Sequence, residues 1–150
     1  MIHKTRALSL ALAAAAVIGM APIADARETI HRFPIEAALN KLKASGQLGE
    51  GVKLYFGTQK FPKPKAQLGL ARTNKKTNFF KKSDQEACDW AFASSMMALV
   101  AYAQKVGGNA IVNIRSNYKS QQFSSETEYT CGAGNITGGT AFIGDVVKLP

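Results

Sequence analysis

A long helix at residues 84–106 constrains the fold more than any other feature of this sequence. Ser83 to Glu86 match a capping box, in which the serine oxygen accepts a backbone N–H and the glutamate reciprocates. The helix should end at Gly107-Gly108, and its 23 residues would span about 35 Å, the width of a small domain. One stripe of the helix is apolar: Cys88, Phe92, Ser95, Met96, Leu99, Ala103 and Val106. A second apolar sector lies beside it: Trp90, Ala93, Met97, Val100 and Ala101. More than half of the helix surface should therefore be buried, by further chain or by another subunit.

The remaining pattern favours strands. A short helix is expected to follow Pro34 and to run to Leu42. Period-2 alternation predicts strands at residues 52–57, 67–71, 109–118, 127–133 and 140–149. Residues 61–65, 74–78 and 121–125 are interpreted as connections and turns. In the strand at 109–118, Ala110, Val112 and Ile114 should share one face. Because there is no βαβ alternation, the order favours an α+β fold, with an antiparallel sheet of about four strands packed on one long central helix.

The first 26 residues are typical of a cleavable signal peptide. A basic start precedes an apolar, alanine-rich run at residues 7–23, and Ala24-Asp25-Ala26 fits the small-x-small cleavage pattern. The run is barely long enough to span a bilayer, and no basic stop-transfer cluster follows it. We therefore expect a signal peptide at 1–26, a single domain at 27–150 with no transmembrane segment, and a periplasmic or secreted location.

Two cysteines follow the signal, Cys88 and Cys131. In an oxidising compartment, a count of two allows one intramolecular pair. The chain-entropy model values closure of this 43-residue loop at about 4 kcal/mol. The strand pattern places Cys131 on the inward face of the sheet, and Cys88 lies in the first turns of the helix that covers that face. We expect a structural disulfide. A redox-active or intermolecular pair is the alternative, which the lack of a C-x-x-C motif disfavours.

Residues 27–150 are strongly basic. The sequence has 19 Lys+Arg and 10 Asp+Glu, and the signal contains Lys4, Arg6 and Asp25, which leaves 17 basic and 9 acidic residues and a net charge of +8. Such an excess favours solubility and attraction to polyanions. Outside a bacterial cytoplasm, these are lipopolysaccharide, anionic lipid or stray nucleic acid.

Much of this charge is concentrated between Gly51 and Ser83, where no acidic residue occurs. Nine basic residues lie there: Lys53, Lys60, Lys63, Lys65, Arg72, Lys75, Lys76, Lys81 and Lys82. Five aromatic residues interleave with them: Tyr55, Phe56, Phe61, Phe79 and Phe80. This composition is compatible with a polyanion-binding surface that combines charge with apolar contacts. The alternative is a solvated, lysine-rich loop that keeps an edge strand from aggregating, with the aromatic residues in the core.

Motifs of the common enzyme classes are missing from the sequence. The glycines at 132–139 have the spacing G-x-G-x-x-x-G and precede a strand, so we expect a structural hairpin rather than a dinucleotide loop. No G-x-x-x-x-G-K-[ST] supports P-loop ATP hydrolysis, and no G-x-S-x-G elbow supports a serine hydrolase. We expect no enzyme activity, no ATP and no cofactor.

Metal and small-ligand sites have few candidate residues. His31 is the one histidine after the signal, and a zinc site needs three or four convergent ligands. Glu126 and Glu128 share an outer strand face, which is interpreted as solvated surface, with weak binding of a hard cation as the alternative. Three helix residues are interpreted as core rather than as a ligand-binding stripe: Trp90, Met96 and Met97.

Four motifs resemble those of a family of small, signal-bearing bacterial periplasmic proteins. They are GVKLYFG at Gly51–Gly57, TNKKTN at Thr73–Asn78, SDxEACxWAF at Ser83–Phe92 and DTEYxC at Glu126–Cys131, where Glu126 replaces the aspartate. This resemblance covers nearly all of residues 27–150. Members are sometimes labelled "excinuclease ATPase subunit", but the missing P-loop and the export signal argue against transferring that activity.

A weaker resemblance, confined to residues 95–114, is to the Rcs stress-sensing outer-membrane lipoprotein and to YbjQ-type domains that are called heavy-metal-binding. It implies a related fold. The lipidated cysteine of the sensor has no counterpart, because neither cysteine here directly follows the signal.

We expect a non-enzymatic periplasmic binding or envelope-associated module that contacts an anionic envelope component through the basic segment 53–82. One alternative is a self-assembling structural homo-oligomer that uses the outer face of helix 84–106. Another alternative is a weak metal-binding or stress-sensing domain.

Overall fold

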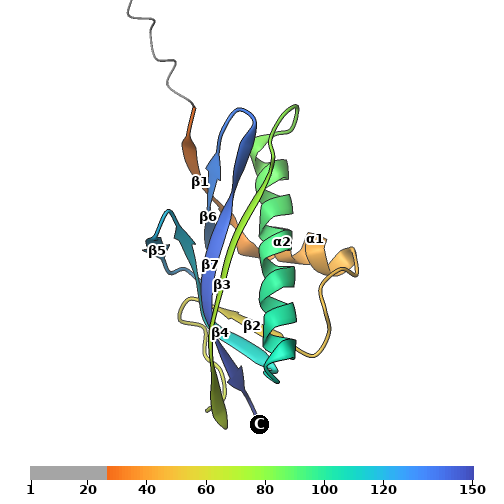
Figure 1. The fold of residues 1–150 in the computed structure, drawn as a ribbon, viewed down its shortest axis with the longest axis vertical. Helices are drawn as coiled ribbons and strands as arrows, with labels where there is room; N and C mark the ends of the chain where they lie inside the picture. Colours follow the sequence, from red (N-terminus) through yellow and green to blue (C-terminus); the bar gives the residue numbers. More distant parts are fainter. Residues whose placement is uncertain (1–26) are drawn as a thin grey trace, which may run out of the picture.

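The computed structural model describes residues 27–150, so the expected signal peptide and its cleavage site lie outside the described residues. This part of the chain contains seven strands and two helices. The strands form one sheet, which curls around the longer helix (Figure 1). In chain order the elements are β1 (Thr29–Pro34), α1 (Ile35–Ala44), β2 (Lys53–Phe56), β3 (Ala66–Asn78), α2 (Asp84–Lys105), β4 (Ala110–Tyr118), β5 (Gln121–Phe123), β6 (Glu128–Ala133) and β7 (Thr137–Lys148).

Helix α2 begins where the capping box predicts. The Oγ of Ser83 accepts a hydrogen bond from the backbone N–H of Glu86 at 3.1 Å. The helix ends before Gly107, whose φ of +82° is a left-handed conformation that glycine adopts without strain. Nine residues of α2 are buried: Ala87, Cys88, Ala91, Phe92, Ser95, Met96, Leu99, Val100 and Ala103. The predicted core stripe is confirmed, with Val106 packed at the edge of the core.

The second sector of α2 is covered in part by the chain itself. Helix α1 packs beside α2, and the loop after α1 covers the C-terminal half of the sector. A Cβ added to Gly49 in that loop would lie 3.0 Å from Cγ1 of Val100, which is 1 % exposed. At Val100, further chain thus covers the second sector, which is one of the two expected ways of burying it. Trp90, which was expected in the core, is 54 % exposed and lines a cavity between α1 and α2.

The sheet confirms the α+β class but not the predicted number or direction of strands. Its order is β1-β6-β7-β4-β2, with β3 on the other side of β7 and β5 beside β4. The pair β2–β4 is parallel, and the remaining pairs are antiparallel. The expectation of about four antiparallel strands is wrong, since seven mixed strands form a curled half-barrel.

Strand β3 accounts for much of this difference. Of its 13 residues, only Ala71 is buried. Residues 74–78, which were interpreted as a turn, continue the strand opposite Thr137–Ala141 of β7. No strand among residues 27–150 pairs with its other edge. A polar edge strand of this kind lacks the apolar alternation by which strands are recognised. The strands β1 and β5 are also not predicted from the sequence, because they are short and have no buried residue.

A bulge in β4 changes which residues face α2. Asn113 has a φ of +52°, and the pairing of β4 with β7 shifts between Val112 and Arg115. As a result, Ile111 and Ile114 lie in the core under α2. Ala110 and Val112 lie in a second, smaller cluster with Val147, Leu149, Tyr55 and Phe61. The prediction that Ile114 shares a face with Ala110 and Val112 is wrong, because strict alternation cannot anticipate the extra residue.

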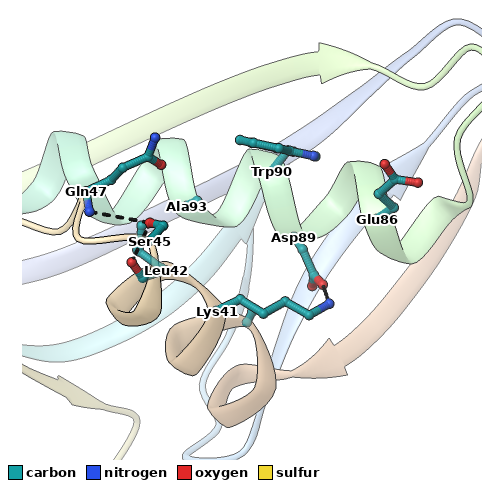
Figure 2. A pocket seen from close by; sticks show the side chains of 9 residues that line it. Lys41, Leu42, Ser45, Gln47, Glu86, Asp89, Trp90 and Ala93 are labelled. Atoms are coloured by element: carbon teal, nitrogen blue, oxygen red, sulfur yellow. Dashed lines mark hydrogen bonds and ion pairs between the residues drawn. The ribbon is translucent and has the colours of Figure 1, made fainter.

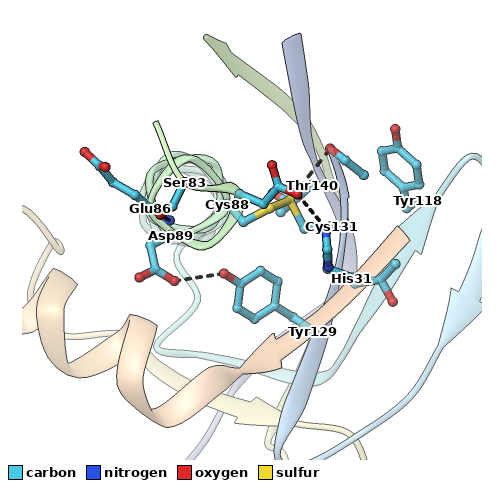
Figure 3. Close-up of a disulfide and its surroundings, with 12 residues drawn as sticks. His31, Ser83, Glu86, Cys88, Asp89, Tyr118, Tyr129, Cys131 and Thr140 are labelled. Atoms are coloured by element: carbon cyan, nitrogen blue, oxygen red, sulfur yellow. Dashed lines mark hydrogen bonds and ion pairs between the residues drawn. A yellow bond between two sulfur atoms is a disulfide. The ribbon is translucent and has the colours of Figure 1, made fainter. Parts of the chain in front are cut away.

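The Cys88–Cys131 disulfide is confirmed and joins α2 to β6 (Figure 3). Both cysteines are completely buried, and their Cα atoms are 6.0 Å apart. Beside them, the ring centroid of Phe92 lies 4.7 Å from that of Tyr129 and 5.7 Å from that of Phe142. The hydroxyls of Ser95 and Thr140 satisfy each other at 2.9 Å across the same interface. Helix and sheet are thus joined by covalent, aromatic and polar contacts.

Candidate functional site

Eight of the nine basic residues of segment 53–82 lie on β3 and on the two connections that flank it, and the ninth lies at the start of β2. We call the nine residues the basic edge. Lys53 begins β2, and Lys60, Lys63 and Lys65 belong to the β2–β3 connection. Arg72, Lys75 and Lys76 lie on β3, and Lys81 and Lys82 lie in the turn before α2. Since β3 has 13 residues and a strand rises about 3.3 Å per residue, this strand spans about 43 Å. It runs along much of the long dimension of the molecule (Figure 1).

The cations of the basic edge have no carboxylate partner among residues 27–150. The ion pairs of the described chain join Arg27 and His31 to Asp84, Lys41 to Asp89, and Lys119 to Glu28. Within the basic edge, the ammonium of Lys82 donates to the carbonyl oxygen of Asn78 at 3.1 Å, which leaves its charge intact. The edge therefore carries nine positive charges that the fold itself does not neutralise.

Most aromatic residues of the segment are structural. Phe56 and Phe79 are buried in the core. Tyr55 and Phe61 pack against each other in the second cluster, with ring centroids 5.7 Å apart. Phe80 alone is exposed, at 59 %, with the Lys81 ammonium 5.3 Å from its ring centroid. The interleaved aromatic residues thus anchor the segment to the sheet, and they do not form a stacking surface.

A groove lies beside the basic edge, between β3 and the β4–β5 hairpin. Its volume is about 380 Å³, within the range of about 300–1,000 Å³ that is common for small-molecule sites. The groove is lined by Arg72, Thr73, Asn74, Asn117, Lys119, Ser120 and Ala141. The β4–β5 hairpin lies on the side of the sheet opposite α2 (Figure 1). We call this cavity the outer groove; no acidic residue lines it.

The hairpin that forms one wall has an unusual backbone. Lys119 and Ser120 both have positive φ, +50° and +63°, as a two-residue turn of type I′ requires. Neither residue is Gly, Asn or Asp, so the sequence gives no signal for this turn. This is why sequence reasoning does not find Lys119 and Ser120 as site residues. The structure brings them opposite Arg72, which the sequence does predict.

Contacts below the groove hold this hairpin in place. The Lys119 ammonium donates to Glu28 at 2.5 Å, and the Tyr118 hydroxyl donates to the same carboxylate at 3.2 Å. The hydrogen bond from Lys119 lowers the pKa of Glu28, and the same bond raises the pKa of Lys119. Burial raises the pKa of Tyr118, and Glu28 adds to this effect. A Cβ at Gly132 would lie 2.0 Å from the Tyr118 hydroxyl oxygen, so the tyrosine can occupy this position only above a glycine.

A second cavity of about 260 Å³ lies between α1 and α2 (Figure 2). Ala38, Leu42 and Ala93 provide apolar walls, and Trp90 stands at its rim. The Lys41 ammonium binds Asp89 at 2.6 Å, and Asp89 also accepts from the Tyr129 hydroxyl at 3.0 Å (Figure 3). Burial raises the pKa of Tyr129, and the charge of Asp89 raises it further. The cations and anions of this cavity thus largely satisfy one another.

Two further alternatives from the sequence are a nucleotide loop at the glycine-rich segment 132–139 and a cation site at two glutamates. The glycine-rich segment 132–139 joins β6 to β7 as a hairpin, with Gly132 paired to Gly139. Glu126 accepts a hydrogen bond from the Thr58 hydroxyl at 2.5 Å, and Glu128 is exposed at the start of β6. Among residues 27–150, no three His, Cys, Asp or Glu side chains lie together as metal ligands would.

In the same part of the chain, no helix combines the length and the apolar character needed to cross a bilayer. Comparison with family models, with curated proteins and with solved structures gives no match for this chain.

Proposed function

We propose that residues 27–150 form a non-enzymatic, envelope-associated binding module of the periplasm, which contacts an anionic polymer or surface through the basic edge. One observation carries this proposal: the nine cations of the basic edge have no carboxylate partner among the described residues. Adjacent cations that the fold leaves unneutralised attract polyanions and release their counterions on contact.

The buried disulfide supports the expected location outside the cytoplasm. Cys88 and Cys131 are inaccessible and joined, and disulfides of this kind persist mainly in oxidising compartments. The envelope of a bacterium presents dense anionic surfaces in such a compartment. A basic, disulfide-containing module is suited to these conditions.

The proposal is tested by measuring the binding of residues 27–150, with the disulfide intact, to lipopolysaccharide, to vesicles rich in anionic lipid and to single-stranded DNA. Binding to at least one of them is expected at low salt and should weaken steeply as salt is added. The double variant K75Q/K76Q should bind about thirtyfold more weakly, because it removes two charges from β3, each worth about 1 kcal/mol near an anionic surface.

The matched control is K43Q/K105Q, which removes two exposed lysines from α1 and α2. It should bind nearly as well as the unmodified chain. If none of the three polyanions binds at low salt, or if both double variants lose equal affinity, the proposal fails.

Self-assembly through the outer face of α2 is the second candidate. Two aromatic residues of α2, Trp90 and Tyr102, are 54 % and 39 % exposed, and aromatic residues are enriched at protein interfaces. Light scattering on concentrated protein separates the two functions, since a monomer at all concentrations removes the second.

A further inference from the structure

The outer groove differs from the rest of the basic edge because it is an open hollow with walls on more than one side. Lysines along a strand attract any polyanion, but the groove has walls from three elements: β3, β7 and the β4–β5 hairpin. Two of its lining residues, Arg72 and Lys119, are cationic, and no lining residue is acidic. A group that enters it would contact several side chains at once.

The cations suit a phosphate group. The Arg72 guanidinium has no hydrogen-bond partner among residues 27–150, so its fork of donors is available for two oxygens of one anion. Lys119 uses one of its three N–H donors on Glu28 and retains two. A phosphate monoester carries a charge of about −1.5 to −2 at neutral pH; the unpaired guanidinium of Arg72 would supply the main countercharge, while Lys119, whose charge is shared with Glu28, would supply N–H donors.

The neutral lining suits the hydroxyl groups of a sugar. Asn74, Asn117 and Ser120 each offer both a donor and an acceptor, as a saccharide hydroxyl requires. The Ala141 methyl group provides a small apolar surface between them. The Lys119–Ser120 turn is held by Tyr118 and Glu28, so this wall is preorganised.

Single-stranded nucleic acid fits the same groove poorly. Its bases bind by stacking on exposed aromatic rings, but the aromatic residues of the segment are packed in the core or in the second cluster, and Phe80 is distant along the strand, beyond the end of β3. No aromatic residue lines the groove. The geometry therefore favours a phosphorylated saccharide over a nucleotide chain.

We propose that the outer groove is a specific site for a sugar phosphate, with Arg72 and Lys119 on the phosphate and Asn74, Asn117 and Ser120 on the sugar hydroxyls. This inference rests on the proposed polyanion-binding function and names its ligand class. The phosphate could belong to a soluble sugar phosphate or to the phosphorylated sugar of a lipid-anchored glycan, since the groups that are recognised are the same.

The test uses amide NMR titration of disulfide-intact residues 27–150 with glucose 1-phosphate, glucose and inorganic phosphate in separate arms. Glucose 1-phosphate should shift the signals of the groove residues at lower concentration than either of the other two. R72Q should weaken its binding about tenfold or more, because a charged hydrogen-bond pair is lost. R72K should recover only part of the loss, because lysine lacks the fork.

The matched control is K43Q, which removes one exposed cation from α1, outside both the groove and the basic edge. It should leave glucose 1-phosphate binding within about twofold of the unmodified chain, a difference well below 1 kcal/mol. If R72Q and K43Q have equal effects, or if inorganic phosphate binds as tightly as the sugar phosphate, the sugar site is refuted.

The polymer titrations show which proposal fails. If lipopolysaccharide or anionic vesicles bind but glucose 1-phosphate shifts no groove signal, the groove site is wrong and the polyanion function stands. If glucose 1-phosphate binds in the groove and no polymer binds, the basic edge has no polymer function and the ligand is a soluble sugar phosphate. If glucose 1-phosphate competes with lipopolysaccharide, and if R72Q abolishes this competition, the phosphate that the groove binds belongs to a lipid-anchored glycan.

Discussion

At the scale of single residues, the contact between Gly132 and Tyr118 determines the wall of the outer groove. A Cβ at position 132 would lie 2.0 Å from the hydroxyl oxygen and 2.1 Å from Cζ of Tyr118. Gly132→Ala should therefore displace the ring from Glu28 and destabilise the fold by about 1–3 kcal/mol, the usual cost of overpacking. The pKa of Tyr118, which burial and Glu28 raise, should fall toward its ordinary value, as NMR of labelled tyrosine would measure.

A double-mutant cycle provides the control. The three atoms nearest to the added methyl group all belong to Tyr118, so Gly132→Ala should cost much less in a Tyr118→Ala background than in the unmodified chain. Equal costs in the two backgrounds, measured by urea unfolding, would show that the clash with Tyr118 does not explain the effect.

At the scale of elements, Asp84 connects the strand β1 to the start of α2. Its carboxylate accepts hydrogen bonds from Arg27 and, at 2.7 Å, from His31. Burial alone would raise the pKa of Asp84, but the bonds from Arg27 and His31 hold it below the ordinary value of 3.8. Because the folded-state pKa is lowered, the stabilisation is present above the unfolded-state pKa and is lost as pH falls through the folded-state pKa.

Asp84→Asn should consequently lower the melting temperature at neutral pH and have little effect once the pH is well below 3.8. The difference between the two melting curves should close as the pH falls from about 5 toward 2. Glu128→Gln is a suitable control, because Glu128 is exposed and has no ion pair among the described residues. A difference that stays constant over this pH range would contradict the role given to Asp84.

At the scale of the whole molecule, the Cys88–Cys131 disulfide links the helix to the sheet across 43 residues of chain. Replacing both cysteines by alanine should lower the free energy of unfolding by about 4 kcal/mol, mainly because the unfolded chain gains freedom. Urea unfolding with and without reductant measures the effect. The reductant should destabilise the unmodified chain and leave the double variant unchanged, and an unmodified chain that is insensitive to complete reduction would contradict the prediction.

The sequence predicts those elements whose signals are local and strong. Helix α2 has a cap, a glycine stop and an apolar stripe, and the disulfide follows from two independent patterns that meet at Cys88 and Cys131. Strand β3 cannot be predicted in the same way, because its edge position leaves only Ala71 buried. The bulge at Asn113 is set by pairing with a distant strand, which no local pattern encodes.

The candidate site also contains one residue that the sequence predicts and others that it does not. Arg72 is predicted as part of a cationic run, whose charge is visible in the sequence. Lys119 and Ser120 become site residues only through a turn with positive φ and through Tyr118 resting on Gly132, both of which are tertiary features. Sequence reasoning thus finds the charge of the candidate site but not the groove beside it.

The open edge of β3 has a further consequence for crowded surfaces. Its unpaired backbone amides and carbonyls could receive a strand from a neighbouring copy, and mutual repulsion between the cations of Arg72, Lys75 and Lys76 opposes that approach. A polymer that neutralises these charges removes the repulsion while holding many copies close together. On such a polymer, the edges of two copies would no longer be kept apart by charge alone.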